Sequence, residues 1–438
     1  MSSVIVSKFG GAALADAEKI KNVAEIIKSN PDRRYVVVSA PGQVSPDDIK
    51  VTDLLYICYS RYENRENFME PLTAVDDRFA EIAQGLGVNF DVAAEIAELK
   101  KSLFFGKSKD NAASRGIYLM AKILAEYLGW EFVDAAKIIF LDNDGSLNEA
   151  KTTEAITNTL GRAKNAVISG GYGTVLNTTK ILMSRGGADA TGAIVARAIK
   201  ADVFEKWTEH RHIYIADPAI VKNPAKIRHL TYSELIELTY MGINAVHEEV
   251  LLMLKNIGVL TNIRSIHYPD DDGTYISATL PEGIDRGVAA CVSGRRKFKM
   301  LKIEKMGLNK TYGIGEKVFG AFARRGISCE HYVSGIYHFA VVLKNPMFDI
   351  KRKEILDDII AAIHPDSITI EKDLSLVAVV GETMGTTKGI FARIFDAIAA
   401  ADVKVHLIDQ GADNLNIIIG VFDEDFEKTV NAVYQAIV

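Results

Sequence analysis

The stretch Val4–Gly11, VIVSKFGG, decides the fold, because an apolar strand pattern runs directly into a lysine and two glycines. A helical pattern follows at residues 16–29. Glycine adopts unusual backbone angles at little cost, so one interpretation is a plain tight turn. In the other, Gly10 and Gly11 let backbone N–H groups approach a phosphate, the next helix offers its N-terminal dipole, and Lys8 supplies a full charge. The stretch by itself leaves both interpretations open.

Strands and helices alternate along the first two-thirds of the chain. Apolar strand patterns at residues 34–42, 165–173 and 202–208 are separated by amphipathic helical patterns. This alternation predicts an α/β fold, with a mainly parallel sheet sandwiched by helices. Ligands of such sheets bind at the carboxyl ends of the strands. We therefore expect one shared site where glycine-rich turns end three strands, at Gly10–Gly11, Pro41–Gly42 and Gly170–Gly171.

The last third of the chain contains an internal repeat. Residues 311–343 can be laid over the stretch that begins at Thr387. A constant spacing of 76 residues joins Gly313 to Gly389, Phe319 to Phe395, Ile327 to Val403 and Gly335 to Gly411. A fixed spacing at four landmark positions indicates duplication, and each copy reads β-α-β-β. Two unrelated small α/β domains are the weaker alternative.

Composition narrows the class of protein. A chain of 438 residues predicts two or three domains. The net charge of −6, without a long Lys/Arg run, argues against a nucleic-acid-binding surface. The three cysteines are far apart, which predicts neither a disulfide framework nor a zinc site. No cationic and apolar leader opens the chain, and no apolar run approaches the roughly 18 residues of a membrane span. We expect a cytoplasmic protein without a membrane partner.

Three further segments complete a resemblance to a known family. They are SRGGADATGAIVARAIKAD at residues 184–202, WTEHRHIYIADPAIVKNPAKI at 207–227, and LTYMGINAVHEEVLLMLKNIGVLTNIRS at 238–265. Together with KFGG and with VVVSAPG followed by VTDLL, their order resembles the aspartokinases, and the doubled tail resembles tandem ACT modules. The resemblance covers essentially the whole chain. It implies an amino-acid kinase domain at residues 1–296 and ACT modules at 297–372 and 373–438, the last strand packing back on the first module.

The activity that the resemblance implies is transfer of the ATP γ-phosphoryl group to the side-chain carboxylate of L-aspartate, which feeds lysine, threonine and methionine biosynthesis. A carboxylate nucleophile is already ionised at pH 7, so no general base is required. The requirement is for positioning and charge neutralisation of the transferred phosphate. Magnesium bound through the phosphates keeps its waters, so no dedicated metal ligands are expected in the protein.

The same resemblance implies roles for individual residues. Lys8 would be the main cation at the phosphates, and Asp189 would hold that lysine or the water shell of the metal; otherwise Asp189 is a helix N-terminal acid that stabilises the dipole. The phosphates would be lined by backbone N–H groups of Gly10, Gly11, Gly170 and Gly171. The adenosine would be bordered by Thr208, Glu209, Tyr214 and Asp217. Arg185 would clamp the α-carboxylate of aspartate, and Thr52 would donate to the substrate or cap the helix that follows it.

Several positions depart from the family pattern. Ala12 and Ala13 stand where hydroxyls are usual, and Ala188 replaces a serine. Ile117 stands where a glutamate would hold the substrate's α-ammonium, and Glu209 and Ala219 replace an aspartate and an arginine. An unpaired buried ammonium costs roughly 2–5 kcal/mol of binding. Three hypotheses follow: an aspartokinase, a kinase for an acid without an amino group, and a weakly catalytic or silent paralogue that senses amino acids.

The doubled tail implies regulation and assembly. An effector such as lysine or threonine would bind between paired ACT modules, in at least a homodimer, and would shift the kinase between states. Edge strands of such modules commonly pair with another copy. The candidate effector contacts lie at equivalent turns of the two copies: Ser334, Gly335, Asp409, Gln410 and Gly411. A purely structural, dimerising role for the tail is the alternative.

Overall fold

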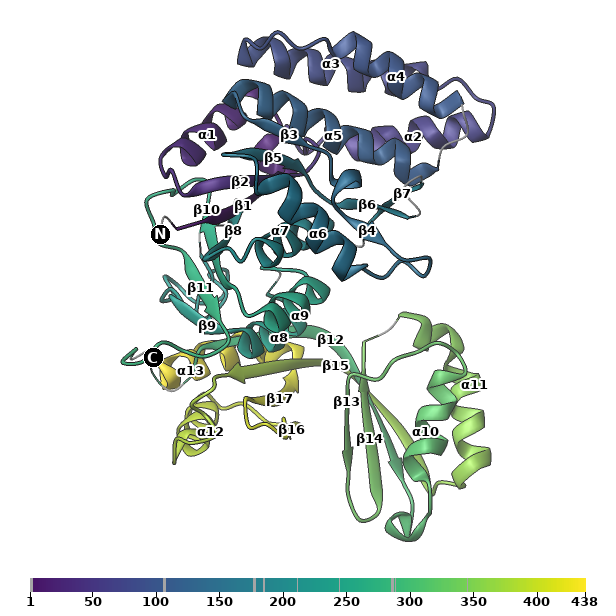
Figure 1. The fold of residues 1–438 in the computed structure, drawn as a ribbon. Helices are drawn as coiled ribbons and strands as arrows, with labels where there is room; N and C mark the ends of the chain where they lie inside the picture. The colour runs from purple at the N-terminus through teal and green to yellow at the C-terminus, as the bar shows by residue number, and fades with distance from the viewer. Residues whose placement is uncertain are drawn as a thin grey trace. The chain divides into compact units, whose positions relative to one another are not determined.

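The computed structural model describes residues 3–104, 108–175, 179–183, 186–210, 212–243, 245–284, 287, 289–344 and 346–438. Its internal contacts divide the chain into two units (Figure 1). Unit 1 comprises Met1–Ile213, Ile227–Ile236 and Asn244–Glu282. Unit 2 comprises Tyr214–Lys226, Glu237–Ile243 and Gly283–Val438. The division therefore does not follow a single cut in the sequence.

Unit 1 is built on an eight-stranded sheet. Its order is β3 (Glu131–Val133), β5 (Ala166–Ser169), β2 (Arg33–Val38), β1 (Ile5–Phe9), β8 (Val203–Thr208), β10 (Leu260–Ser265), β11 (Thr274–Ser277) and β9 (His229–Thr231). Neighbouring strands run parallel except β10 and β11. The mainly parallel sheet predicted from the alternating pattern is confirmed. A small second sheet holds β4 (Phe140–Leu141), β6 (Tyr172–Val175) and β7 (Thr179–Leu182).

Helices cover both faces of the large sheet. They are α1 (Ala17–Lys28), α2 (Val51–Glu63), α3 (Met69–Leu86), α4 (Val92–Phe104), α5 (Lys109–Leu128), α6 (Glu149–Leu160), α7 (Gly187–Ala198), α8 (Tyr232–Tyr240, which continues into unit 2) and α9 (Glu248–Ile257). Successive residues of a strand point to opposite faces. Phe9 accordingly enters the core formed with α1, α2, α3 and α5, whereas Lys8 points to α7. In Figure 1, α3 and α4 form an outer layer over α2 and α5.

Unit 2 contains a six-stranded antiparallel sheet with helices beside it. The strand order is β13 (His331–Ser334), β14 (His338–Leu343), β12 (Cys291–Glu304), β15 (Ser367–Val380), β17 (Asn416–Phe422) and β16 (Leu407–Gln410). The helices are α10 (Ile314–Ala323), α11 (Pro346–Ile363), α12 (Ile390–Ala400) and α13 (Phe426–Ile437). The two copies therefore read β12-α10-β13-β14-α11 and β15-α12-β16-β17-α13. The duplicated β-α-β-β pattern is confirmed, with Gly313 and Gly389 directly preceding α10 and α12 at φ of 69° and 82°.

The two copies share their central strands. β12 and β15 pair along nearly their whole length, so residues 291–295 of β12 lie against the part of β15 that belongs to the second copy. Lys297 and Asp373, the first residues of the two predicted modules, both have positive φ, and a register irregularity lies between Arg295 and Phe298. The last strand, β17, pairs with β15 and β16, and the chain ends in helix α13. The first copy is therefore joined to the second through β12, not through the last strand.

Two short segments of unit 2, residues 214–226 and 237–243, come from the part of the sequence that otherwise forms unit 1. Val292 donates its N–H to the carbonyl of Ile215 (2.7 Å), and Ala225 donates its N–H to the hydroxyl of Tyr434 (3.1 Å). In the last turns of α8, Glu237 accepts a hydrogen bond from Asn416 of β17 (2.6 Å). These bonds explain why residues 214–226 and 237–243 group with the C-terminal modules.

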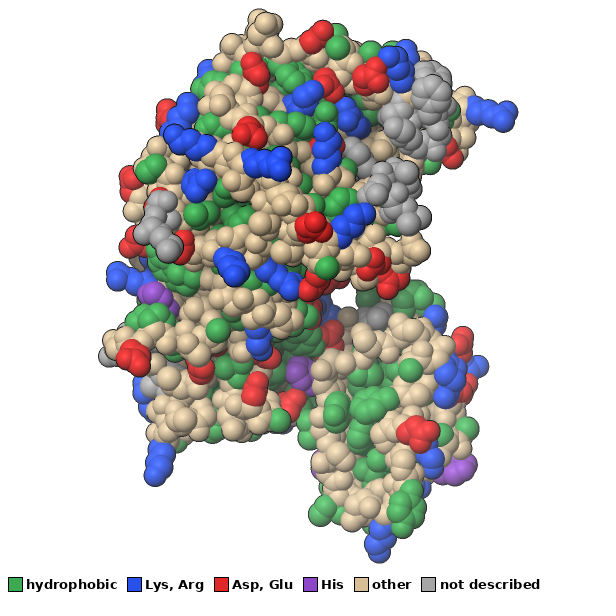
Figure 2. Space-filling model, in the orientation of Figure 1, with side chains coloured by type: hydrophobic (Ala, Val, Ile, Leu, Met, Phe, Trp, Pro, Cys, Tyr) green, Lys and Arg blue, Asp and Glu red, His purple; other side chains and the backbone are tan. Residues whose placement is uncertain are grey.

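The surface is of mixed charge. On the face drawn in Figure 2, Lys and Arg side chains are interspersed with Asp and Glu side chains. Among the helices that the structure describes, none is both long and apolar enough to span a bilayer.

Candidate functional site

Three charged side chains meet beneath the carboxyl end of β1. The Lys8 ammonium lies 2.7 Å from one carboxylate oxygen of Asp189, and the Lys206 ammonium lies 2.7 Å from the other. Lys8 comes from β1, Lys206 from β8 and Asp189 from the first turn of α7. Side-chain exposures are 11%, 13% and 5% for Lys8, Lys206 and Asp189. The structure thus places a nearly buried Lys-Asp-Lys triad at the edge where a ligand is expected.

The triad shifts the ionisation of its own members. Burial by itself would raise the pKa of Asp189, but the two neighbouring ammonium groups outweigh burial and hold that pKa below its usual range. Burial lowers the pKa of Lys206, and Lys8 lowers it further, while Asp189 opposes both. Asp189 is therefore ionised at neutral pH, and two cations share one carboxylate.

The loop after β1 and the loop after β2 contact each other beside the triad. Gly42 donates its N–H to the carbonyl of Gly11 at 2.8 Å. A Cβ on Gly11 would lie 2.6 Å from the carbonyl oxygen of Ala40, and one on Gly42 would lie 2.7 Å from the carbonyl carbon of Gly11. Only glycine permits this approach of the β1 and β2 loops. At Gly10, by contrast, a Cβ would meet only the Lys8 ammonium at 3.6 Å, an ordinary contact distance.

The loop after β5 closes the other side. Gly171 has φ of 89°, and a Cβ on Gly187 would lie 3.0 Å from the Cα of Gly171, so this loop packs directly against the start of α7. The N–H of Gly170 donates to the carbonyl of Val38, and the N–H of Gly171 donates to the hydroxyl of Thr191, both at 2.9 Å. These two N–H groups are therefore engaged within the protein, which argues against their predicted use as phosphate donors.

A cavity of about 550 Å³ opens between these loops. The predicted residues Gly11, Thr52, Ile117, Gly170, Gly171 and Glu209 all line it. Its other walls are Ala12, Ser39, Ala40, Pro41, Gly42, Gln43, Lys50, Met183, Gly187 and Ala188. Residues far apart in the sequence thus meet in one cavity, where the loops after β1, β2, β5 and β8 lie beside α5 and the start of α7.

The sequence relatives agree with this geometry. Residues 3–265 match the amino acid kinase family, and residues 377–437 match the ACT domain. Aspartokinase 3 of Bacillus subtilis is 30% identical over 446 residues, which cover 98% of each chain. This chain belongs to the aspartokinases of the amino acid kinase family.

Solved aspartokinase structures have the same fold. The aspartate kinase of Clostridium acetobutylicum superposes with a TM-score of 0.94 at 38% identity, covering 100% of both chains. Two structures of aspartokinase III of Escherichia coli, at 21% identity and 99% coverage of each chain, have TM-scores of 0.73 and 0.78. The first of those two contains aspartate and ADP, and the second contains lysine and aspartate.

Not every predicted site residue of this aspartokinase gathers at the cavity. The hydroxyl of Thr208, at the end of β8, accepts the N–H of His210 at 3.3 Å. Tyr214 and Asp217 belong to unit 2 rather than to the unit that holds Lys8. Arg185 lies outside the described residues. The proposed contacts of these four residues stay predictions.

Thr52 lines the cavity, but it does not cap α2. The helix begins one residue earlier, at Val51, and its N-cap is Lys50, which makes no side-chain capping bond. The capping alternative for Thr52 is therefore wrong, because Thr52 is the second residue of the helix and not the residue before it. Its hydroxyl sits in the first turn, beside the cavity.

The predicted effector residues are engaged in local hydrogen bonds. Asp409 accepts from the imidazole of His331 at 2.9 Å, which joins edge strand β16 of one copy to edge strand β13 of the other. Gln410 donates to the side-chain oxygen of Asn414 at 2.9 Å. The N–H of Gly411 donates to the side-chain oxygen of Asn416 at 3.2 Å. Ser334 is the last residue of β13, and Gly335 begins the turn after it. Effector binding at these residues stays a prediction.

Lys206 is the site residue that sequence reasoning missed. In VFEKWT it reads as the polar position of an alternating strand, next to Glu205. Only its pairing with Lys8 in the register of β1 and β8 shows that it faces the same side as Lys8. Glu205 points to the opposite face, where it accepts from Ser7, Arg33 and Trp207.

The Lys8–Asp189–Lys206 triad of this aspartokinase fits the phosphates of a nucleotide. Two ammonium groups against one carboxylate leave positive charge, and the N-terminus of α7 adds to it. Among the described residues, no group of three or more His, Cys, Asp and Glu side chains could hold a metal ion. A magnesium ion bound through the phosphates therefore stays a prediction.

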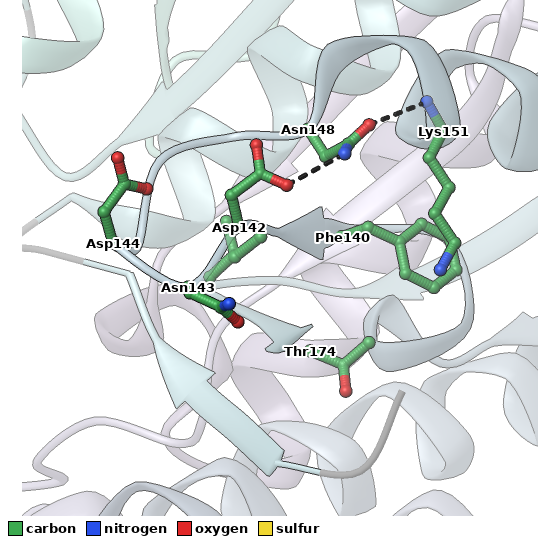
Figure 3. Close-up of a pocket in the computed structure, with 8 residues that line it drawn as sticks. Phe140, Asp142, Asn143, Asp144, Asn148, Lys151 and Thr174 are labelled. Carbon is green, nitrogen blue, oxygen red and sulfur yellow. Dashed lines mark hydrogen bonds between the residues drawn. The ribbon is translucent and has the colours of Figure 1, made fainter. Parts of the chain in front are cut away.

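A second cavity, of about 500 Å³, lies beside the small sheet (Figure 3). It is lined by Phe140, Leu141, Asp142, Asn143, Asp144, Asn148, Lys151 and Thr174. Asn148 donates to Asp142 at 2.9 Å and accepts the N–H of Lys151 at 3.1 Å, and the Lys151 ammonium lies 4.1 Å from the centre of the Phe140 ring. None of the predicted site residues that the structure describes lines it.

Proposed function

We propose that this chain transfers the γ-phosphoryl group of ATP to the side-chain carboxylate of L-aspartate, forming 4-phospho-L-aspartate and ADP. The observation that carries the proposal is the Lys8–Asp189–Lys206 triad beside a glycine-walled cavity at the carboxyl edge of the sheet. Membership of the aspartokinases supports the acceptor. The product belongs to the synthesis of lysine, threonine and methionine.

The site supplies positioning and charge rather than a base. The acceptor carboxylate is ionised at neutral pH, so it attacks without losing a proton. Lys8 is placed to bind the terminal phosphates, and Asp189 fixes the Lys8 ammonium in position. Magnesium, when bound with ATP, neutralises phosphate charge. Thr52 lies where its hydroxyl can hold the substrate at the cavity wall.

The C-terminal modules give the regulatory part of the proposal. Two ACT modules, at residues 297–372 and 373–438, bind an amino-acid effector such as lysine or threonine, and the chain forms at least a homodimer through them. The match of residues 377–437 to the ACT domain supports this. So do the large apolar side chains exposed on and beside edge strand β13: Tyr332, Ile336 and Tyr337.

An acyl-phosphate trap tests the catalytic proposal. Purified chain, ATP and magnesium are incubated with hydroxylamine and, in separate reactions, with aspartate, glutamate, succinate or malate. We expect aspartate to yield hydroxamate, and Lys8→Ala to lower that yield by at least about 100-fold, because a charge-assisted contact to the transferred phosphate is lost. Lys122→Ala is the matched control, since Lys122 pairs with Glu95 on α4, outside the cavity lining.

Each other result decides between the hypotheses. Hydroxamate from succinate or malate alone would replace aspartate with an acid that lacks the amino group, as Ile117 would permit. No hydroxamate from any acid, with an amino acid still raising the melting temperature, would reject catalysis and leave an amino-acid sensor.

A further inference from the structure

Lys206 and Lys8 are side by side on adjacent parallel strands. The register of β1 and β8 pairs Lys8 directly with Lys206. Neighbouring strands are about 4.8 Å apart, and paired residues point to the same face. Two ammonium groups are therefore held close together in a nearly buried position, where they repel each other. A sheet keeps such a pair only where an anion stabilises it.

Asp189 is the anion that the structure supplies, and it is shared evenly. One carboxylate oxygen contacts Lys8 and the other contacts Lys206, each at 2.7 Å. Two cations and one carboxylate leave a net charge of one positive unit. The nearest acid along β8, Glu205, lies on the opposite face and is bound by Arg33, so it does not neutralise Lys206. Glu209 is exposed at the cavity wall.

We propose that Lys206 is a positioning residue of the phosphoryl-transfer site, which holds one oxygen of Asp189 and so leaves the charge of Lys8 available to the nucleotide phosphates. Without Lys206, Lys8 and Asp189 form a neutral pair, and the attraction for an anion is lost. This inference rests on the proposed kinase function. It concerns a residue that no motif in the sequence pointed to.

The test is a charge cycle read by nucleotide binding. Isothermal titration with ADP, with and without magnesium, compares the full-length wild type with Lys206→Met, Lys206→Arg, Asp189→Asn and the double variant Lys206→Met/Asp189→Asn. We expect Lys206→Met to weaken ADP binding by about 10- to 100-fold, the range of a lost charge-assisted contact. Lys206→Arg should recover most of that loss. Lys122→Met is the control and should bind ADP like the wild type.

The double variant separates charge from structure. Asp189→Asn removes the negative charge that Lys8 would otherwise face alone, so the double variant regains one net positive unit. We expect it to bind ADP more tightly than Lys206→Met. A double variant that binds more weakly than Lys206→Met would overturn the proposal, because two lost contacts would then simply add. Unchanged binding in Lys206→Met would overturn it too.

The hydroxamate assay keeps this inference distinct from the proposed function. A wild type that makes no hydroxamate, while Lys206→Met loses ADP affinity and the double variant regains it, rejects the kinase reaction and retains Lys206 as an anion-site residue. If Lys206→Met forms hydroxamate with the wild-type KM for ATP, the proposed role of Lys206 is rejected and the kinase function is retained. Absence of ADP binding by the wild type would reject both.

Discussion

Ile117 gives the cavity an apolar wall at a place where a charge would be useful. It is nearly buried on α5, and its Cδ1 lies 3.5 Å from the position of a Cβ on Gly171. Arg115, two residues earlier, is paired with Glu95 at 2.8 Å. Within the described lining, Glu209 is the acidic side chain. The described lining therefore offers no carboxylate besides Glu209 for a substrate ammonium.

A glutamate in place of Ile117 tests whether the cavity lacks a carboxylate for the substrate ammonium. We expect Ile117→Glu to lower the KM for aspartate by about tenfold, because a charge-assisted hydrogen bond contributes roughly 1.5–3 kcal/mol and part of that is offset by burying the carboxylate. Steady-state kinetics with the hydroxamate assay measures it. A glutamine in the variant Ile117→Gln has nearly the shape of glutamate but no charge, so this variant should not lower the KM for aspartate. If KM rises equally in both variants, another group already holds the ammonium.

At the scale of single residues, sequence reasoning was strong where a motif carried the residue and weak elsewhere. Lys8, Asp189, Gly11 and Glu209 belong to recognisable stretches, and the structure brings them to one edge. Lys206 could not be found this way, because its role depends on the register between β1 and β8, which no local pattern encodes.

At the scale of elements, the site is held together by the contact of two loops. The loops after β1 and β2 meet at Gly11 and Gly42, with no room for a Cβ on either. This arrangement answers the question that KFGG raises. The two glycines have different tasks: Gly11 lets the loops touch, and Gly10 leaves space above the Lys8 ammonium.

Alanine is therefore expected to affect stability differently at Gly42, where the two loops touch, and at Gly10, where a Cβ has space. Gly42→Ala forces backbone atoms apart and should lower the free energy of unfolding by about 1–3 kcal/mol. Gly10→Ala has a compatible φ of −80° and should change the free energy of unfolding by less than about 1 kcal/mol. Its methyl group should nevertheless weaken ATP binding, because it covers Lys8. Urea unfolding followed by tryptophan fluorescence measures stability, since Trp130 and Trp207 both lie in unit 1.

Equal losses of stability in the two variants would show that the contact between the loops does not require glycine at position 42. Unimpaired ATP binding by Gly10→Ala would show that Lys8 is not approached from the side of Gly10.

Helices and strands were predicted best where the hydrophobic pattern was regular over many residues. The strands β1, β2, β5 and β8 and the helices α1, α2, α5 and α7 followed from alternation and amphipathic spacing. The alternative of a cap at Thr52 would start α2 two residues late, at Asp53, because Lys50 makes no side-chain capping bond and so leaves no signal in the sequence.

At the scale of the whole molecule, the C-terminal tail was predicted as two modules in series, but its strands do not respect that division. β12 and β15 each run through a predicted boundary and pair with one another. A repeat in the sequence reveals the two copies but not how their strands pair with one another. Nor could sequence show that residues 214–226 and 237–243 group with the tail.

Assembly is predicted at this scale as well. β13 is the last strand at one end of the six-stranded sheet, and Tyr332, Ile336 and Tyr337 on and beside it are exposed. We expect sedimentation equilibrium to give twice the chain mass of 48.0 kDa, and Tyr332→Lys/Ile336→Asp to give a monomer. Ile350→Asp, an equally exposed apolar position on α11, is the control and should stay dimeric. A wild type that sediments as a monomer would contradict the proposal.

The pairing of β12 with β15 across the two copies also bears on inheritance. A module that completes its own sheet can be copied, lost or transplanted between genes as an independent part. Here a recombination at residue 373 would sever β15 in mid-strand and leave residues 291–295 of β12 without their partner. The two copies are therefore expected to be inherited as one unit. Chimaeras designed from this chain should exchange both copies together.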